Sequence, residues 1–159
     1  MDQQLRITSP VFENGGFIPS KYTGDGDNIS PPLTVSGVSE DTKSLVLIID
    51  DPDAATDPKG PGITFDHWVV FNIPPTVTEI SENSVPSAAT QGENGTGESG
   101  YIGPAPPTGT HRYHFRLYSL REKLNLDQSA TKAKVQAALR PILINRAELL
   151  GNYQRESAS

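Results

Sequence analysis

The chain has no cysteine, and this absence excludes a disulfide framework, a cysteine-ligated zinc site and thiol chemistry. It has no apolar run that approaches the roughly 20 residues of a membrane-spanning helix. The polar start, Met1–Arg6, lacks the apolar segment of a secretory signal peptide. Lysine and arginine form no cluster and the formal net charge is -6, which argues against a nucleic-acid footprint and against an electrostatic membrane anchor. These absences predict a cytoplasmic protein that neither spans a membrane nor binds nucleic acid.

Glycine and proline are frequent, with 14 of each among 159 residues, and this composition favours short strands joined by many turns. No internal repeat and no linker divides the chain. We therefore expect a single domain over residues 1–159, long enough to bury a sizeable core without disulfides or metals.

Three segments have the pattern of β-strands. Ser44–Asp50 is a continuous apolar run rich in β-branched residues, of the kind that is buried on both faces of a sheet. His67–Ile73 is similar and is stopped by Pro74-Pro75. Arg112–Tyr118 alternates between apolar and polar residues, which predicts a strand with one buried face and one wet face.

The period changes near the C-terminal end of the sequence. Thr131 is placed to cap a helix whose apolar residues recur with helical spacing from Val135 onward. Pro141 should break or kink this helix, and Ile142–Leu150 then has the pattern of a second helix that ends at Gly151. Strands followed by a short helical tail predict a mainly β fold, a β-sandwich with short C-terminal helices.

Polar side chains gather at the ends of the three predicted strands, where a rigid sheet can position loop residues for binding or catalysis. Two carboxylates follow the first strand, a histidine opens the second, and a His-Arg-Tyr sequence opens the third. These residues are Asp51, Asp53, His67, His111, Arg112 and Tyr113. If the three strands are neighbours and their ends converge, the six side chains can line one concave pocket.

Each of these residues also has an ordinary structural interpretation. An Asp-Pro-Asp sequence after a strand is most often a turn, and a histidine beside Trp68 is more often packed than ligating. Arg112 can simply pair with an aspartate, and Tyr113 lies on the apolar face of its strand and can belong to the core. Taken singly, none of the six residues identifies a function.

The stretch Gly103–Pro107, which precedes the His-Arg-Tyr sequence, is rich in proline. Its prolines carry no N–H, so the amides of Gly103, Ala105 and Thr108–Thr110 are the available donors. A stiff loop with a few exposed amides can form a small anion-binding concavity, to which the two histidines can add hydrogen bonds. Carboxylates beside a bound anion weaken its binding by charge repulsion, unless one carboxylate is protonated or each accepts a hydrogen bond from its own donor.

Four segments of the chain form a specific pattern in a fixed order. They are Tyr22–Leu33, Leu45–Ala54, Asp66–Pro74 and Gly100–Phe115. The last one contains Gly-Tyr-Ile-Gly-Pro-Ala-Pro-Pro and then His-Arg-Tyr, and it is the most distinctive of the four. From about Leu5 to Tyr153 the chain resembles the phosphatidylethanolamine-binding protein family, most of all its short bacterial and archaeal branch, often called Raf-kinase-inhibitor-like.

The resemblance implies a β-sandwich of two antiparallel sheets with a few short helices. It also implies a small pocket that holds phosphate, phosphorylethanolamine, acetate or a similar anion, with no cofactor and no metal. The implied pocket residues are Asp51, Asp53, His67, Gly103, Ala105, Pro106, His111 and Tyr113, with Arg112 expected to brace the pocket. Ala55 departs from the family pattern, which has proline at that place, and implies a looser pocket rim.

Members of this family are mostly binders and regulators, so the resemblance implies a non-enzymatic anion-binding protein that regulates or inhibits a protein partner such as a kinase or a protease. An alternative is an interaction protein with a vestigial pocket, which would use the Ser81–Gly100 loop as its contact surface. A less favoured alternative is a phosphohydrolase in which Asp51, Asp53, His67 and His111 hold a divalent ion, although the sequence offers no obvious nucleophile with a paired base. An exposed sheet edge could also support a homodimer.

Overall fold

The three segments predicted as strands form three neighbouring strands of the molecule, as predicted. The computed structural model describes residues 4–155, so part of the polar start, residues 1–3, lies outside the described residues. Strand β4, Ser44–Asp51, is buried along its whole length. Strand β5 spans Phe65–Ile73, and strand β8, His111–Leu120, alternates between buried and partly exposed residues.

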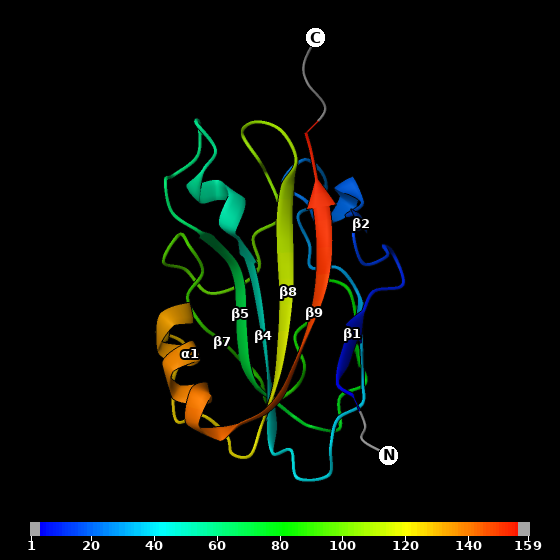
Figure 1. Cartoon of the computed structure of the whole chain (residues 1–159), viewed down its shortest axis with the longest axis vertical. Coiled ribbons are helices and arrows are strands. Elements are labelled where there is room, and N and C mark those ends of the chain that lie inside the picture. Colours follow the sequence, from blue (N-terminus) through cyan, green and yellow to red (C-terminus); the bar gives the residue numbers. More distant parts are fainter. Residues whose placement is uncertain (1–3, 156–159) are drawn as a thin grey trace.

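The strands form one large and one small sheet (Figure 1). The large sheet has the order β2-β9-β8-β4-β5-β7, in which β2 is Gly16–Phe17, β7 is Thr90–Gln91 and β9 is Leu143–Tyr153. The small sheet has the order β1-β3-β6, in which β1 is Arg6–Thr8, β3 is Leu33–Ser36 and β6 is Glu79–Ile80. Every strand pair is antiparallel except the two-residue pair of β2 with β9, which is parallel.

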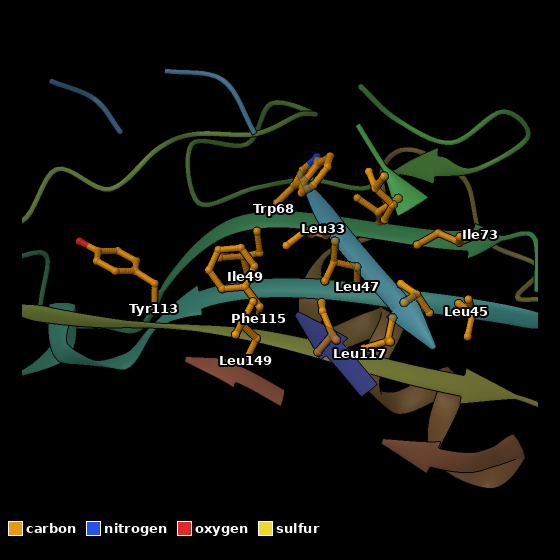
Figure 2. Close-up of a cluster of buried hydrophobic side chains, with 14 of the residues drawn as sticks. Leu33, Leu45, Leu47, Ile49, Trp68, Ile73, Tyr113, Phe115, Leu117 and Leu149 are labelled. Atoms are coloured by element: carbon orange, nitrogen blue, oxygen red, sulfur yellow. The ribbon is translucent and has the colours of Figure 1, made fainter. Parts of the chain in front are cut away.

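Two apolar clusters cover opposite faces of the large sheet, which explains why β4 is apolar at successive positions. Leu45, Leu47 and Ile49 face the small sheet in the main core (Figure 2). Val46 and Ile48 face the other way and pack in a second cluster that includes residues of helix α1, Lys132–Leu139. Burying each such side chain contributes about 1.5–3 kcal/mol, so a strand covered on both faces needs apolar residues throughout.

The first predicted helix is confirmed, and the second is wrong. Thr131 caps α1 by accepting a hydrogen bond from the amide of Lys134, and the helix gives way to a 3-10 turn, Arg140–Ile142. The segment predicted as the helix Ile142–Leu150 is instead almost entirely part of β9, which pairs with β8 along its length.

The local sequence of β9 is compatible with a helix as well as with a strand. Its inward-facing residues include Leu149, Gly151 and Tyr153, which alternate as a strand requires. A Cβ atom at Gly151 would lie 2.6 Å from the side chain of Ile18, so this glycine permits close packing and does not end a helix. Hydrogen bonding to β8 therefore decides the conformation of a segment whose own pattern is ambiguous.

The segments that join strands β4, β5 and β8, which the sequence predicts as long loops over 50–66 and 81–110, contain short ordered elements. The turn η2, Pro52–Ala55, follows β4, and β7 lies within the second loop. A further 3-10 turn, η1, spans Ser20–Tyr22. None of the helices among residues 4–155 is long and apolar enough to cross a membrane.

Candidate functional site

The ends of β4, β5 and β8 converge as the sequence predicts. The three strands are neighbours in the order β8-β4-β5, and in this antiparallel arrangement the end of β4 meets the beginnings of both other strands. Asp51 pairs with Phe65 in the β-ladder, and Asp50 pairs with His114. The turn η2 and the loop before β8 lie at this same end of the sheet, at the top of Figure 1.

A cavity of about 270 Å³ opens at this end of the sheet. Its walls come from β4, β5, β8 and the loops that precede β5 and β8. The lining residues are Asp51, Ala54, Pro61, Phe65, His67, Ile102, Gly103, Ala105, Pro106, Pro107, His111 and Tyr113. All predicted site residues except Asp53 and Arg112 therefore line one cavity, and much of the remaining wall is apolar.

Asp53 and Arg112 form an ion pair outside the cavity wall. A guanidinium nitrogen of Arg112 donates to Asp53 Oδ1 at 2.9 Å, and the Arg112 amide donates to Asp53 Oδ2 at 2.7 Å. The hydrogen bond from the Arg112 side chain holds the pKa of Asp53 below its usual range. The pair ties η2 to the start of β8, which agrees with a bracing role for Arg112 and gives Asp53 the same role.

His111 lies between two carboxylates. Its Nδ1 is 2.5 Å from Asp51 Oδ2, and its Nε2 is 2.8 Å from Asp57 Oδ2. Burial opposes a positive charge on the ring, but the hydrogen bonds to Asp51 and Asp57 outweigh it and raise the pKa of His111. Both ring nitrogens can donate only when the imidazole is protonated. The geometry therefore fits an imidazolium ring that donates to two carboxylates.

Asp57 is the site residue that the sequence analysis did not identify. Its carboxylate accepts from the Thr108 hydroxyl at 2.6 Å, from the Thr108 amide and from the Lys59 amide, as well as from His111. These hydrogen bonds, led by that from Thr108, hold its pKa far below the usual range. The available sequence signal was a repeated Asp-Pro pair, at Asp51 and Asp57.

His67 is held as a neutral ring. Its Nδ1 lies 2.6 Å from the carbonyl oxygen of Ile102, and because a carbonyl only accepts, Nδ1 carries the proton. Burial lowers the pKa of His67 to about 4. At neutral pH its Nε2 is therefore an acceptor, and no group among residues 4–155 donates a hydrogen bond to it.

Tyr113 is both a core residue and a cavity residue, so its two predicted roles coincide. The residue is 1% exposed, and its ring packs edge-on against His67 with a centroid distance of 5.2 Å. Figure 2 shows its hydroxyl pointing away from the apolar cluster that contains Ile49 and Phe115. The hydroxyl is buried and has no hydrogen-bond partner within the described range, residues 4–155, and burial raises its pKa.

The proline-rich loop is fixed by contacts to distant segments. The Gly103 amide donates to Asn28 Oδ1 at 2.7 Å, and the Gly24 amide donates to the Pro104 carbonyl at 2.8 Å. A Cβ atom on Gly103 would lie 2.6 Å from Asn28 Oδ1, so only glycine fits there. Two of the predicted anion donors, the amides of Gly103 and Thr108, are thus already used within the protein.

The described residues contain no group of three or more histidine, cysteine or acidic side chains arranged to hold a metal ion. The geometry explains this, because both nitrogens of His111 and Nδ1 of His67 already have protein partners. A divalent ion would have to displace these hydrogen bonds. The chemistry that remains open is hydrogen bonding by the Tyr113 hydroxyl and by His67 Nε2.

Comparisons with known proteins agree with the fold. The family model described as phosphatidylethanolamine-binding protein matches residues 8–154. The chain is 45% identical over 156 residues to a UPF0098 protein of Methanothermobacter thermautotrophicus, covering 95% of this chain and 99% of that protein. The relative's name states no activity.

Two solved structures are similar over nearly the whole chain. The first is a putative phosphatidylethanolamine-binding protein homologue from Chlamydia trachomatis, with a TM-score of 0.90, 39% identity and coverage of 97% of this chain and 99% of that one. The second, from E. coli, is described as a new member of the mammalian family, with a TM-score of 0.85, 33% identity and coverage of 96% and 99%.

Proposed function

The chain belongs to the phosphatidylethanolamine-binding protein family, and from that premise we propose that it is a non-enzymatic binding protein whose cavity receives a small oxyanion-bearing group such as a phosphate monoester. The observation that carries this proposal is that Tyr113 lines the cavity while its hydroxyl is buried and has no protein partner among residues 4–155. Buried polar groups are nearly always hydrogen-bonded, so a ligand oxygen is the partner that this hydroxyl lacks.

The dimensions of the cavity support a small ligand. Its volume of about 270 Å³ lies just below the roughly 300–1,000 Å³ of pockets that take drug-sized molecules. A phosphate or carboxylate with a short substituent fits such a volume, whereas the acyl chains of a lipid would remain outside. The apolar wall formed by Ala54, Phe65 and Ile102 would pack on the substituent.

The chemistry of the lining favours binding over catalysis. Nucleophilic catalysis needs a nucleophile beside an available base. Among residues 4–155, no serine, threonine or lysine lines the cavity, and the two ring nitrogens of His111 are occupied by Asp51 and Asp57. We therefore propose that the cavity holds its ligand without transforming it.

The regulatory role toward a kinase or a protease, and the cytoplasmic location, stay predictions of the sequence. The alternative contact surface, the Ser81–Gly100 loop, is tied to β5 by backbone bonds from Gly92 to Val69 and from Gly95 to Asp66. No observation on this loop favours the interaction-protein alternative over the cavity.

The test is a titration of the isotope-labelled protein with phosphorylethanolamine, in which two-dimensional NMR spectra are recorded at each ligand concentration. We expect saturable shifts at His67, Ala105 and Tyr113, and an affinity at least about tenfold lower in Tyr113→Phe, because a hydrogen bond to a charged group contributes about 1.5–3 kcal/mol. Tyr118→Phe is the matched control, since Tyr118 lies on the same strand but not in the cavity. An absence of shifts at millimolar ligand, or equal affinity for both variants, would overturn the proposal.

A further inference from the structure

The cavity presents an unusual set of polar atoms for an anion site. No lysine or arginine among residues 4–155 lines it, and the nearby guanidinium of Arg112 is engaged with Asp53. The one cationic group in the described lining, the His111 ring, has no donor left, because Asp51 and Asp57 occupy both of its nitrogens. A ligand therefore meets carboxylates and a histidine whose charge is already compensated.

His67 faces the ligand as an acceptor. Its Nδ1–H donates to the Ile102 carbonyl, so Nε2 offers a lone pair, and a second proton on the ring would have to be added against burial. The ionisable groups around the ring come from neighbouring elements: Asp50 and Asp51 at the end of β4, and His111 and Tyr113 on β8. The charge on His111 further disfavours a charge on His67.

One unpartnered side-chain donor belongs to a neighbouring residue of the same cavity wall. The Tyr113 hydroxyl is buried and unpartnered within the described part of the chain, and the rings of Tyr113 and His67 are in edge-to-face contact. Two neighbouring rings of the cavity wall thus carry one O–H donor and one nitrogen acceptor, neither of which has a partner within the described residues. A fully ionised oxyanion would satisfy Tyr113 but would place an oxygen lone pair against the lone pair of His67 Nε2.

We propose that the cavity selects an acidic group that still carries one proton, with its O–H donated to His67 Nε2 and another oxygen accepting from the Tyr113 hydroxyl. This inference rests on the proposed function and narrows its ligand class to a phosphate monoester in its singly protonated form, or a protonated oxyacid of similar shape. A phosphodiester has no such proton, so the headgroup of an intact phospholipid is excluded from the cavity and the free monoester is admitted.

The pH dependence follows from this geometry. The second pKa of a phosphate monoester is about 6, so about half of it is singly protonated at pH 6 and about one hundredth at pH 8. If only this form binds, the affinity falls about fifty-fold between those two pH values. A sulfate monoester has the same shape and the same single negative charge as the bound form, but it has no proton to donate.

Three ligands test the proposal by calorimetry on the wild-type protein at about pH 6 and about pH 8. They are phosphorylethanolamine, ethanolamine O-sulfate and glycerophosphoethanolamine, which share the aminoethyl group. We expect phosphorylethanolamine to bind about fifty-fold more weakly at the higher pH, and the other two to bind at least about tenfold more weakly than it does at the lower pH.

A variant provides an independent readout. Glutamine has both a donor and an acceptor at the end of its side chain. The affinity of His67→Gln for the sulfate ester should therefore lie within about threefold of its affinity for the phosphate ester, so that most of the discrimination between the two esters is lost. Tyr113→Phe should weaken phosphorylethanolamine while leaving its pH dependence in place. If His67→Gln does not fold, as checked by its NMR spectrum, the three wild-type titrations still decide the question.

Each contrary result has a distinct meaning. Equal binding of the sulfate and phosphate esters at the lower pH would overturn this inference and leave the proposed binding function intact. A sulfate affinity that rises as the pH falls would show that a group of the protein, and not the ligand, carries the proton, which also overturns it. Tighter binding of glycerophosphoethanolamine would assign the site to a lipid headgroup and overturn it. Binding of none of the three would overturn the proposed function as well.

Discussion

Histidines 67 and 111 lie in the same cavity but have opposite electrostatic environments. His67 is buried against a carbonyl, and its pKa is lowered to about 4, whereas hydrogen bonds to two carboxylates raise the pKa of His111 above its usual value. Their sequence contexts are alike, because each lies within the first three residues of a strand. The protonation state of a histidine depends on partners distant in the chain, such as Ile102 for His67, and these partners could not be predicted from sequence.

The lowered pKa of His67 predicts a loss of stability in acid. The unfolded chain takes up a proton near pH 6.5 and the folded protein only near pH 4, so the free energy of unfolding falls as the pH is lowered between these values, by about 3 kcal/mol in total. Urea unfolding at several pH values measures this slope. His67→Gln should flatten it. An unchanged slope in His67→Gln would contradict the assigned environment.

The raised pKa of His111 acts in the opposite direction. Its pairing with Asp51 and Asp57 contributes stability that is fully present below the unfolded pKa of about 6.5 and is lost as the pH rises through the higher folded value. Asp57→Asn removes one of these charges, so we expect the pKa of His111 to fall toward its usual value, as measured by NMR titration of the ring. Glu40→Gln, an equal change of charge at an exposed residue, is the control and should leave the titration unchanged.

At the scale of elements, the sequence predicts a strand best when burial alone determines its pattern. Strand β4 is covered on both faces, and its short continuous apolar run is typical of a strand buried in this way. Strand β9 is covered mainly on one face, and its leucines fit a helical as well as a strand period. The two-residue strands β2, β6 and β7 carry no pattern at all, because contacts made elsewhere in the fold define them.

Gly151 tests the packing of β9. A Cβ atom there would lie 2.6 Å from Ile18 Cγ1 and 2.9 Å from Phe12, so Gly151→Ala should destabilise the protein by about 1–3 kcal/mol through overpacking, as measured by urea unfolding. Ile18→Val removes Cδ1, which would lie 2.8 Å from the added Cβ, so in the Gly151→Ala background it should recover part of the loss and show coupling in a double-mutant cycle. Additive effects of the two substitutions would contradict the close contact between Gly151 and Ile18.

At the scale of the whole molecule, the fold brings the site together from remote parts of the chain. The sequence predicted the convergence of three strand ends, because neighbouring antiparallel strands place alternate ends at the same edge. It did not predict Asp57 or Asn28, which reach the site from separate loops and hold His111 and Gly103. Their roles arise from contacts across 54 and 75 residues, for which the local sequence has no periodic signal.

The homodimer through a sheet edge stays a prediction. The outermost strands of the large sheet, β2 and β7, have two residues each, and such short strands offer few unpaired backbone groups to a second copy. The two large exposed apolar residues of the described chain, Phe17 and Ile63, lie on different segments. A cavity contained within one chain therefore remains the basis for the binding proposal.

A ligand that binds only the folded state should stabilise the whole molecule. At about 100 times its dissociation constant, phosphorylethanolamine would add about 2.7 kcal/mol to the free energy of unfolding. For a chain of this size, that gain raises the melting temperature by about 5–10 °C, which differential scanning calorimetry can measure.

The rise in melting temperature should be larger at pH 6 than at pH 8 at a fixed ligand concentration, because about half of the ester carries a proton at the lower pH. Tyr113→Phe should show a smaller rise at the same concentration, since it lacks the buried hydroxyl that we assign to the ligand. An equal rise in the variant would mean that the ester stabilises the fold from another surface.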